Sequence, residues 1–263
     1  MAPSEFHVSG LCVRLFSSKL PMGVAAAAQA ASILREAVRA RGHATIIVGT
    51  GNSQLELIDA LGAERDIDWK SIEIFHLDEY VGVPANHPAS FRRWLKTHLA
   101  DKVHPGKVHY IEGDAADLEK ELARYGALLS ARSIDLSFVG FGENGHIAFN
   151  DPHVADFSDP LTIKRVTLDH ACRKQQEGEG HFPTIDAVPS EALTLTCPAI
   201  LRSAYWICCV PDRRKAQAVK CALEGPLSPK CPASLARRHP RAFLYLDEES
   251  AALLSPQLTR TTS

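Results

Sequence analysis

Short apolar runs alternate with longer mixed stretches along most of the 263 residues. Continuous apolar runs at 44–49, 134–140 and 205–210 indicate buried strands, because parallel strands covered on both faces lack polar alternation. The pattern predicts further strands at 72–78, 108–111 and 242–246, and helices at 23–41, 53–61, 89–100, 115–131 and 213–223. We therefore expect a Rossmann-like α/β fold, in which an open, mostly parallel sheet carries helices on both faces. The length favours a single domain over residues 1–263.

Two segments interrupt this regularity. Four prolines divide the stretch 151–190, namely Pro152, Pro160, Pro183 and Pro189. A long irregular segment in a compact domain often serves a function, so we expect a loop or lid there. The polar tail from about residue 255 is expected to fray.

Composition excludes several classes of function. The chain is 45% hydrophobic, which suffices for a sizeable core, and its formal net charge is −2 without any block of Lys and Arg. Binding to nucleic acid is therefore not expected. No apolar stretch approaches the eighteen or so residues of a membrane span, and no signal sequence is seen, so no membrane partner is expected. The seven cysteines show neither CxxC spacing nor a disulfide pattern, which predicts the reducing cytoplasm.

The first polar cluster follows the predicted strand 44–49 and contains Gly49, Thr50, Gly51, Asn52 and Ser53. Glycines let backbone N–H groups approach an anion, and the start of the next helix adds favourable potential. The segment has neither the spacing of a nucleotide P-loop nor that of a dinucleotide fold, so a single small phosphate suits it better. The alternative is a tight turn in which Asn52 or Ser53 caps the helix.

The second cluster, His76-Leu77-Asp78-Glu79-Tyr80, lies at the end of the predicted strand 72–78. Side chains alternate along a strand, so Asp78 and Glu79 should point to opposite sides. One of them could face a pocket and act as a general base. The alternative is a solvated strand end.

The third cluster runs from Gly140 to Pro152 and places His146 between Asn144 and Asp151. Histidine titrates near neutral pH, and a carboxylate partner can fix its tautomer. The glycines around it, at a strand exit, favour a functional histidine. The alternative is a structural histidine that caps a turn.

At these clusters the chain resembles the glucosamine-6-phosphate deaminase family, which shares a superfamily with the 6-phosphogluconolactonases. The matching blocks follow the family's order between about residues 45 and 247: LDEYVG (77–82), GHIAFNDP (145–152), ALTLT (192–196), RRKAQAV (213–219), ALEGP (222–226) and CPASLARRHP (231–240). The lactonase branch typically has DER and GHTASLFP-like text at the first two blocks. Tyr80 and the run Ala148-Phe149-Asn150 therefore favour the deaminase branch.

The resemblance implies conversion of glucosamine 6-phosphate and water to fructose 6-phosphate and ammonia, with no metal and no organic cofactor. Asp78 would carry a proton from C2 to C1 of the sugar. His146, held by Asp151, would serve the ring oxygen during ring opening. Lys215 would pair with the phosphate, and the 50–53 loop would donate hydrogen bonds to it. The implied partner is a small amino-sugar phosphate, and a homo-oligomer is possible.

Three positions depart from the family's usual text. Asn144 stands where relatives often have Asp, and Asp151 where they often have Glu. An amide brings no negative charge to His146, and the shorter carboxylate requires the ring to sit differently or to be bridged by water. Relatives also offer the phosphate an arginine before the ALTLT block. Residues 177–183 contain no arginine, and His181 is the candidate substitute.

Two alternatives remain beside the deaminase. One is a sugar-phosphate lactonase or a related isomerase, which release of ammonia would distinguish. The other is a non-catalytic module that binds a sugar phosphate. The joint presence of Asp78, His146 and Asp151 favours an enzyme.

Overall fold

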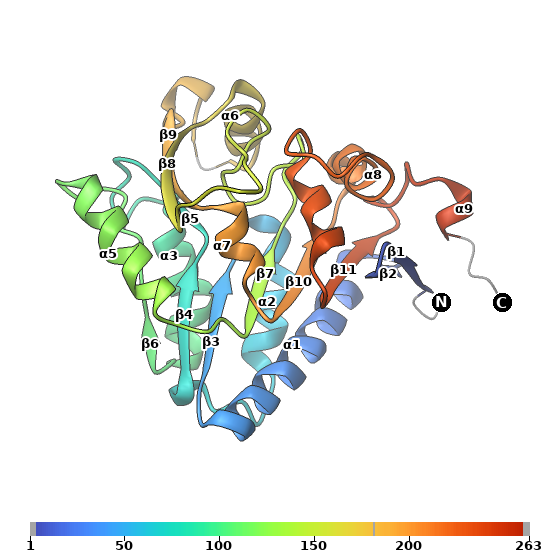
Figure 1. Cartoon of the computed structure of the whole chain (residues 1–263), viewed down its shortest axis with the longest axis horizontal. Coiled ribbons are helices and arrows are strands. Elements are labelled where there is room, and N and C mark those ends of the chain that lie inside the picture. The colour runs from blue at the N-terminus through green and yellow to red at the C-terminus, as the bar shows by residue number, and fades with distance from the viewer. Residues whose placement is uncertain (1–3, 181, 260–263) are drawn as a thin grey trace.

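The computed structural model describes residues 4–180 and 182–259. Within these ranges one large sheet has the strand order β1-β2-β11-β10-β7-β3-β4-β6, and all neighbours are parallel except β1 and β2. Its strands are β1 (Ser4–Val8), β2 (Leu11–Phe16), β3 (Ala44–Val48), β4 (Ile72–His76), β6 (Lys107–Val108), β7 (Leu136–Val139), β10 (Tyr205–Val210) and β11 (Ala242–Asp247). The open, mostly parallel α/β fold is therefore confirmed (Figure 1).

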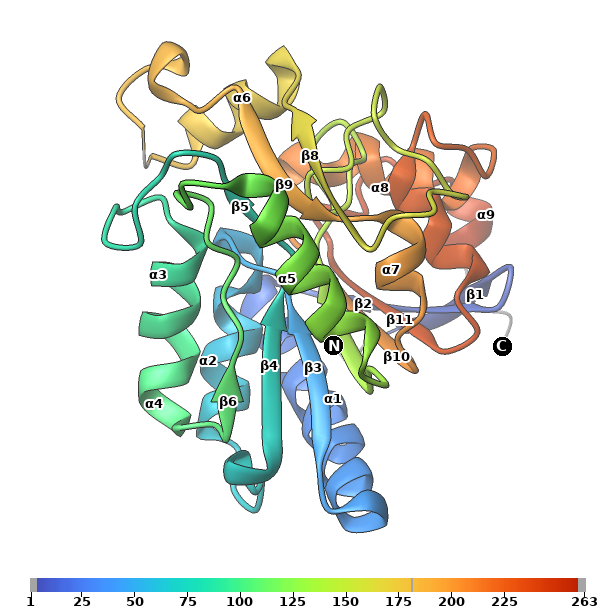
Figure 2. The ribbon, with the colours of Figure 1, turned by 60° about the vertical axis from the view of Figure 1, so that its left-hand side comes forward.

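Helices cover both faces of this sheet. The helices of the described residues are α1 (Lys19–Arg41), α2 (Leu55–Ala63), α3 (Phe91–Leu95), α4 (Asp101–Val103), α5 (Leu118–Ser130), α6 (His170–Gly178), α7 (Cys197–Leu201), α8 (Ala216–Glu224) and α9 (Pro256–Thr259). Figure 2 shows α5 crossing the front of the sheet, with α1 and α2 behind it. Ile46 and Val48 of β3 pack with α1, α2 and α3, whereas Ile47 packs with α5, α7 and α8. Strands that are apolar on both faces thus contribute to the hydrophobic core on each side of the sheet.

Helix α1 ends where the sequence predicts. Gly42 adopts a left-handed φ of 77°, and its N–H donates to the carbonyl of Val38 at 2.7 Å. A residue without Cβ takes this conformation at little cost, so glycine closes the helix. Among the described helices, none is long and apolar enough to cross a membrane.

The stretch 151–190 is more regular than predicted. It contains β8 (Ile163–Thr167) and α6, and β8 joins β9 (Glu191–Leu195) and β5 (Asp78–Tyr80) in an antiparallel sheet of order β5-β9-β8. This small sheet and α6 lie above β3 and β4 in Figure 1. Tyr80, Phe149 and Cys172 belong to the apolar cluster beneath it. The expected loop is therefore a folded layer over the carboxyl ends of the large sheet.

Other boundaries also differ from the prediction. The predicted strand 72–78 breaks at Leu77, so Asp78 begins β5 rather than ending β4. The predicted strand 108–111 contributes only the pair Lys107–Val108. The hairpin β1–β2 was not predicted. Its turn is formed by Ser9 and Gly10, which both have positive φ. The tail from residue 255 begins with α9, and residues 260–263 lie outside the described part.

The order of strands reverses at β3, because β4 follows on one side and β7 lies on the other. In such sheets ligands bind at the carboxyl ends beside the reversal. Gly49 closes this point, since its N–H donates to the carbonyl oxygen of Phe138 at 2.9 Å. A Cβ at Gly49 would lie 2.7 Å from that oxygen, so only glycine fits here. The fold thus brings the first and third polar clusters side by side.

Candidate active site

A cavity lies at this reversal and collects residues from all three polar clusters. Of the predicted site residues, those that line it are Thr50, Gly51, Ser53, Asp78, His146 and Lys215. Asn144 and Asp151 lie behind His146, and Asn52 starts a 3₁₀ turn (Asn52–Gln54) outside the lining. His181 lies outside the described residues. Residues from distant parts of the chain thus share one cavity.

His146 and Asp151 form a close pair. The Nδ1 atom of His146 lies 2.9 Å from Oδ1 of Asp151, although the two are not aligned as a directed hydrogen bond. Asn144 supports both partners, because its amide donates to Asp151 at 2.9 Å and its oxygen accepts the N–H of His146 at 3.0 Å. Burial raises the pKa of Asp151, but His146 and Asn144 outweigh it, so the pKa is lowered. The shorter carboxylate therefore reaches the ring directly, without a bridging water.

Glycine beside His146 makes room for its ring. A Cβ at Gly142 would lie 2.2 Å from Cε1 of His146 and 2.3 Å from Nε2. The N–H of Gly142 also donates to the carbonyl of His146 at 2.8 Å, which folds the loop back on itself. The volume of the His146 ring thus explains the glycine at position 142.

Asp78 lines the cavity and is 6% exposed. Burial raises its pKa well above the ordinary value, and the charge of Glu79 adds to this effect. A carboxylate with raised proton affinity suits a group that takes and returns a proton. Its backbone carbonyl accepts from Nδ1 of His76 at 2.9 Å, and burial lowers the pKa of that histidine to about 3. A neutral imidazole therefore fixes the backbone of Asp78.

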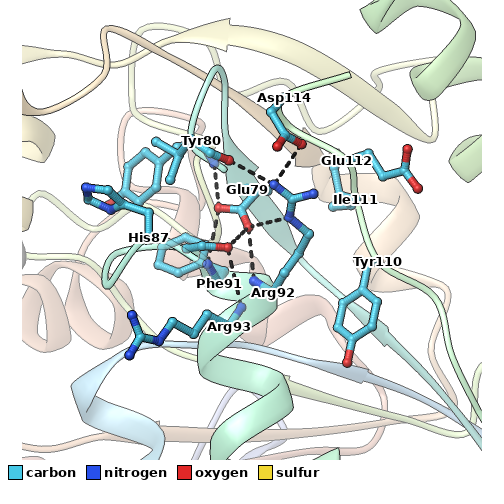
Figure 3. Close-up of polar contacts among 12 residues, drawn as sticks. Glu79, Tyr80, His87, Phe91, Arg92, Arg93, Tyr110, Ile111, Glu112 and Asp114 are labelled. Carbon is cyan, nitrogen blue, oxygen red and sulfur yellow. Dashed lines mark hydrogen bonds and ion pairs between the residues drawn. The ribbon is translucent and has the colours of Figure 1, made fainter. Parts of the chain in front are cut away.

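Glu79 points to the other side of β5, as the alternation of side chains predicts. It is fully buried, and its carboxylate accepts hydrogen bonds around the start of α3 (Figure 3). Only Asp78 of the two adjacent carboxylates lines the cavity.

Lys215 and most of the 49–53 loop also line the cavity. Lys215 ends a 3₁₀ turn (Arg213–Lys215) before α8 and is 3% exposed. Burial lowers its pKa to about 8, although the nearby charge of Glu179 acts in the opposite direction. The buried hydroxyl of Thr50 has no partner among the described residues. Buried donors of this kind are normally satisfied, so this part of the cavity is suited to an anion.

Helix α6 supplies cavity residues that the sequence did not single out. Gln175 accepts the N–H of Glu143 at 2.8 Å and donates to Glu179 at 3.2 Å, whereas Gln176 accepts from the hydroxyl of Tyr80 at 2.5 Å. Gln175, Gln176 and Glu179 all line the cavity. The segment in which the resemblance implies an arginine therefore brings the carboxylate of Glu179 to the cavity. The signal available in the sequence was the spacing of Gln175, Gln176 and Glu179, because residues three and four positions apart lie on the same side of a helix.

The ligating atoms of His146, Asp151 and Cys172 lie within 4.8 Å of one another, so this group could geometrically hold a metal ion. Burial raises the pKa of the Cys172 thiol, and Asp151 adds to the shift. Asp151 contacts His146 at 2.9 Å and accepts from Asn144, so the same group also serves to orient the histidine.

Comparison with known proteins places this site in a family. The sequence profile described as glucosamine-6-phosphate isomerases/6-phosphogluconolactonase matches residues 18–244. The chain belongs to this family.

Within the glucosamine-6-phosphate isomerase/6-phosphogluconolactonase family, the chain is 34% identical to a glucosamine-6-phosphate deaminase of Exiguobacterium sibiricum, over 86% of this chain and 88% of the relative. It is 32% identical to the enzyme of the same name from Oenococcus oeni, over 85% and 92%. The fold matches the structure of a monomeric glucosamine-6-phosphate deaminase with a TM-score of 0.83 and 28% identity, covering 92% and 99%. A 6-phosphogluconolactonase from Shewanella baltica matches at 0.73 and 22%, covering 89% and 97%, which shows the shared fold alone.

Proposed function

We propose that this protein is a glucosamine-6-phosphate deaminase, which converts glucosamine 6-phosphate and water to fructose 6-phosphate and ammonia. The observation that carries the proposal is a single cavity lined by the buried Asp78, by His146 with Asp151 behind it, and by the buried Lys215. The deaminase relatives above 30% identity support the same reaction. The lactonases share the family and the fold, but the one compared is only 22% identical to this chain. A non-catalytic module would not need these groups.

The phosphate is proposed to bind at the part of the cavity formed by Lys215 and the 49–53 loop. The hydroxyl of Thr50 and the ammonium of Lys215 would donate to its oxygens, and backbone N–H groups of the loop would add to them. Lysine acts here as a point charge for phosphate. Binding there places the sugar ring toward Asp78 and His146.

Ring opening is assigned to His146. The imidazole takes the proton of the anomeric hydroxyl and passes it to the ring oxygen as the C1–O5 bond breaks, and Asp151, at 2.9 Å, stabilises the imidazole while it carries the charge. A carboxylate behind a histidine holds the tautomer and offsets the positive charge. The product of this step is the open-chain aldehyde.

Isomerisation is assigned to Asp78. Its carboxylate takes the proton from C2 while a proton passes from the substrate ammonium to O1, which gives an enediol-type intermediate with an amino group at C2. It then returns the proton to C1, which leaves CH₂OH at C1 and a protonated imine at C2. Water adds to C2, and ammonia leaves as the ketone forms. A carboxyl group whose pKa is raised by burial is suited to both transfers.

The cellular setting is part of the proposal. All seven cysteines are free thiols, and this is consistent with the reducing cytoplasm that the sequence predicts.

The test measures ammonia and fructose 6-phosphate released from glucosamine 6-phosphate by the wild type and by Asp78→Asn. The expected result is equal release of both products by the wild type and loss of both in the variant. Asp135→Asn is the matched control, since Asp135 is also buried but binds the N–H of Thr45 at the other end of the sheet. The proposal fails if the folded wild type releases no ammonia.

A further inference from the structure

Glu79 is a buried carboxylate with an unusually complete set of donors. It has no exposed surface, and both oxygens accept two hydrogen bonds (Figure 3). Oε1 accepts the N–H groups of Tyr80 at 3.0 Å and Phe91 at 3.2 Å. Oε2 accepts the hydroxyl of Ser90 at 2.8 Å and the N–H of Arg92 at 3.0 Å. Donors of this kind favour the ionised form of a carboxyl group, although burial opposes them and raises the pKa.

These contacts join two elements of the cavity wall. Glu79 follows Asp78 on β5, and its acceptors hold the start of α3, where Phe91 lines the same cavity. The rings of Tyr80 and Phe91 lie 5.0 Å apart and pack over this junction. The position of Asp78 relative to Phe91 is therefore fixed through Glu79.

The charge of Glu79 is only partly neutralised. Nε of Arg92 lies 3.4 Å from Oε2 of Glu79, but a terminal nitrogen of the same guanidinium lies 2.9 Å from Asp114. That nitrogen also donates to the carbonyl of Val83 at 2.8 Å. Two carboxylates of charge −1 share one guanidinium of charge +1, so the group keeps a net charge of −1.

Other titratable groups face this junction. His76 is neutral, and burial raises the pKa of Tyr80, so neither carries charge near neutral pH. Burial also raises the pKa of Cys172 in α6 and Tyr125 in α5, and both thiol and phenol stay neutral. The remaining charged or titratable groups lie on the cavity side of Asp78: His146, Glu179, Arg214 and Lys215. Glu79 is therefore the charge next to Asp78 on its protein side.

We propose that Glu79 is a positioning residue for the deaminase reaction, which orients Asp78 through β5 and α3 and places a negative charge beside it. This inference rests on the proposed function for its kinetic part. When Asp78 takes the proton from C2, its own negative charge disappears beside that of Glu79. Relief of like-charge repulsion drives this transfer in the forward direction. The same charge slows return of the proton to C1, so Glu79 sets a balance between the two transfers.

The test compares the wild type with Glu79→Gln and Glu79→Asp. The first removes the charge at nearly constant shape, and the second keeps the charge on a shorter chain. Asp78 must be ionised to act as a base, so activity falls as pH drops through its pKa. Without the charge of Glu79 that pKa decreases, and the acidic limb of the kcat profile should move about one pH unit lower in Glu79→Gln.

The expected split is a kcat that falls up to about tenfold in Glu79→Gln with KM within roughly twofold, because a base weakened by one pH unit binds the proton ten times less tightly. Glu79→Asp should keep the wild-type limb. The matched control is Glu121→Gln: Glu121 has a side chain 3% exposed and accepts from Arg124 and from the N–H of Glu112. Loss of its charge should lower the melting temperature without moving the limb.

A second measurement separates this inference from the proposed function. The titration of the Asp78 carboxyl carbon is followed by NMR in ¹³C-labelled wild type and Glu79→Gln, each without substrate. A lower midpoint in the variant supports the electrostatic role even if the wild type releases no ammonia. An unchanged midpoint and an unchanged limb, with a melting temperature that falls as in Glu121→Gln, would overturn the proposal.

Discussion

Replacement of Lys215 by Met should weaken phosphate binding and stabilise the protein at the same time. The ammonium is 3% exposed, and burial lowers its pKa to about 8 from an ordinary value of 10.5. That difference corresponds to about 3 kcal/mol of unfavourable free energy for carrying the charge in the folded state. A charge-assisted hydrogen bond to phosphate is worth roughly 1.5–3 kcal/mol, so KM should rise about 10- to 150-fold.

The sign of the pH effect follows from the lowered pKa. The unfavourable contribution of Lys215 is fully present below pH 8, and it disappears as the lysine loses its proton between pH 8 and 10.5. Lys215→Met should therefore melt several degrees higher than the wild type at pH 7, and this advantage should vanish by pH 10.5. Phosphate affinity of the wild type should fall about tenfold per pH unit above pH 8, because the charged form binds.

The assay combines KM against pH with thermal melts, and calorimetry with inorganic phosphate reports binding independently of turnover. Lys215→Arg is the matched control, since arginine keeps its charge throughout this pH range. Its phosphate affinity should not fall above pH 8. An unchanged KM in Lys215→Met, or a wild-type affinity that stays constant to pH 10, would show that Lys215 does not meet the phosphate.

Two further substitutions probe the cavity walls. Gly142→Ala adds a methyl group 2.2 Å from Cε1 of His146, so the ring must move. Displacement of this size should lower kcat about a hundredfold with little change in KM. A wild-type kcat in steady-state kinetics would show that the position of the His146 ring does not limit catalysis. Glu179→Gln removes a carboxylate that lines the cavity together with Lys215. In the wild type the charge of this carboxylate raises the pKa of Lys215. Repulsion between two unit charges a few ångström apart is about 1 kcal/mol even in water, so KM should fall roughly fivefold at about pH 6, where Lys215 keeps its proton without Glu179. A higher KM would instead mean that Glu179 contacts the sugar.

The large sheet was predictable because its signals are local. The runs at 44–49, 205–210 and 242–246 are apolar on both faces, and the structure places β3, β10 and β11 there. The small sheet was not predictable, because residues 78–80 pair with residues 192–194, more than a hundred positions away. No local pattern reports such pairing.

The site shows the same division. Glycines, Asp78 and His146 follow strands directly, so the rule for strand ends located them in advance. Gln176 and Glu179 reach the cavity only because α6 folds over it, and the proline-broken text around them indicated a loop. The shorter Asp151 was expected to require a different position of the His146 ring or a bridging water, and its oxygen lies 2.9 Å from the ring nitrogen. Side-chain length alone did not decide between these two alternatives.

The central claim is tested most directly by one NMR experiment, in which the purified protein acts on glucosamine 6-phosphate in D₂O. The account predicts ammonium and fructose 6-phosphate in equal amounts. The hydrogen or deuterium that Asp78 delivers should be found at C1 of the product. A folded protein that binds phosphate but yields neither product, or that isomerises the sugar without releasing ammonia, would contradict it.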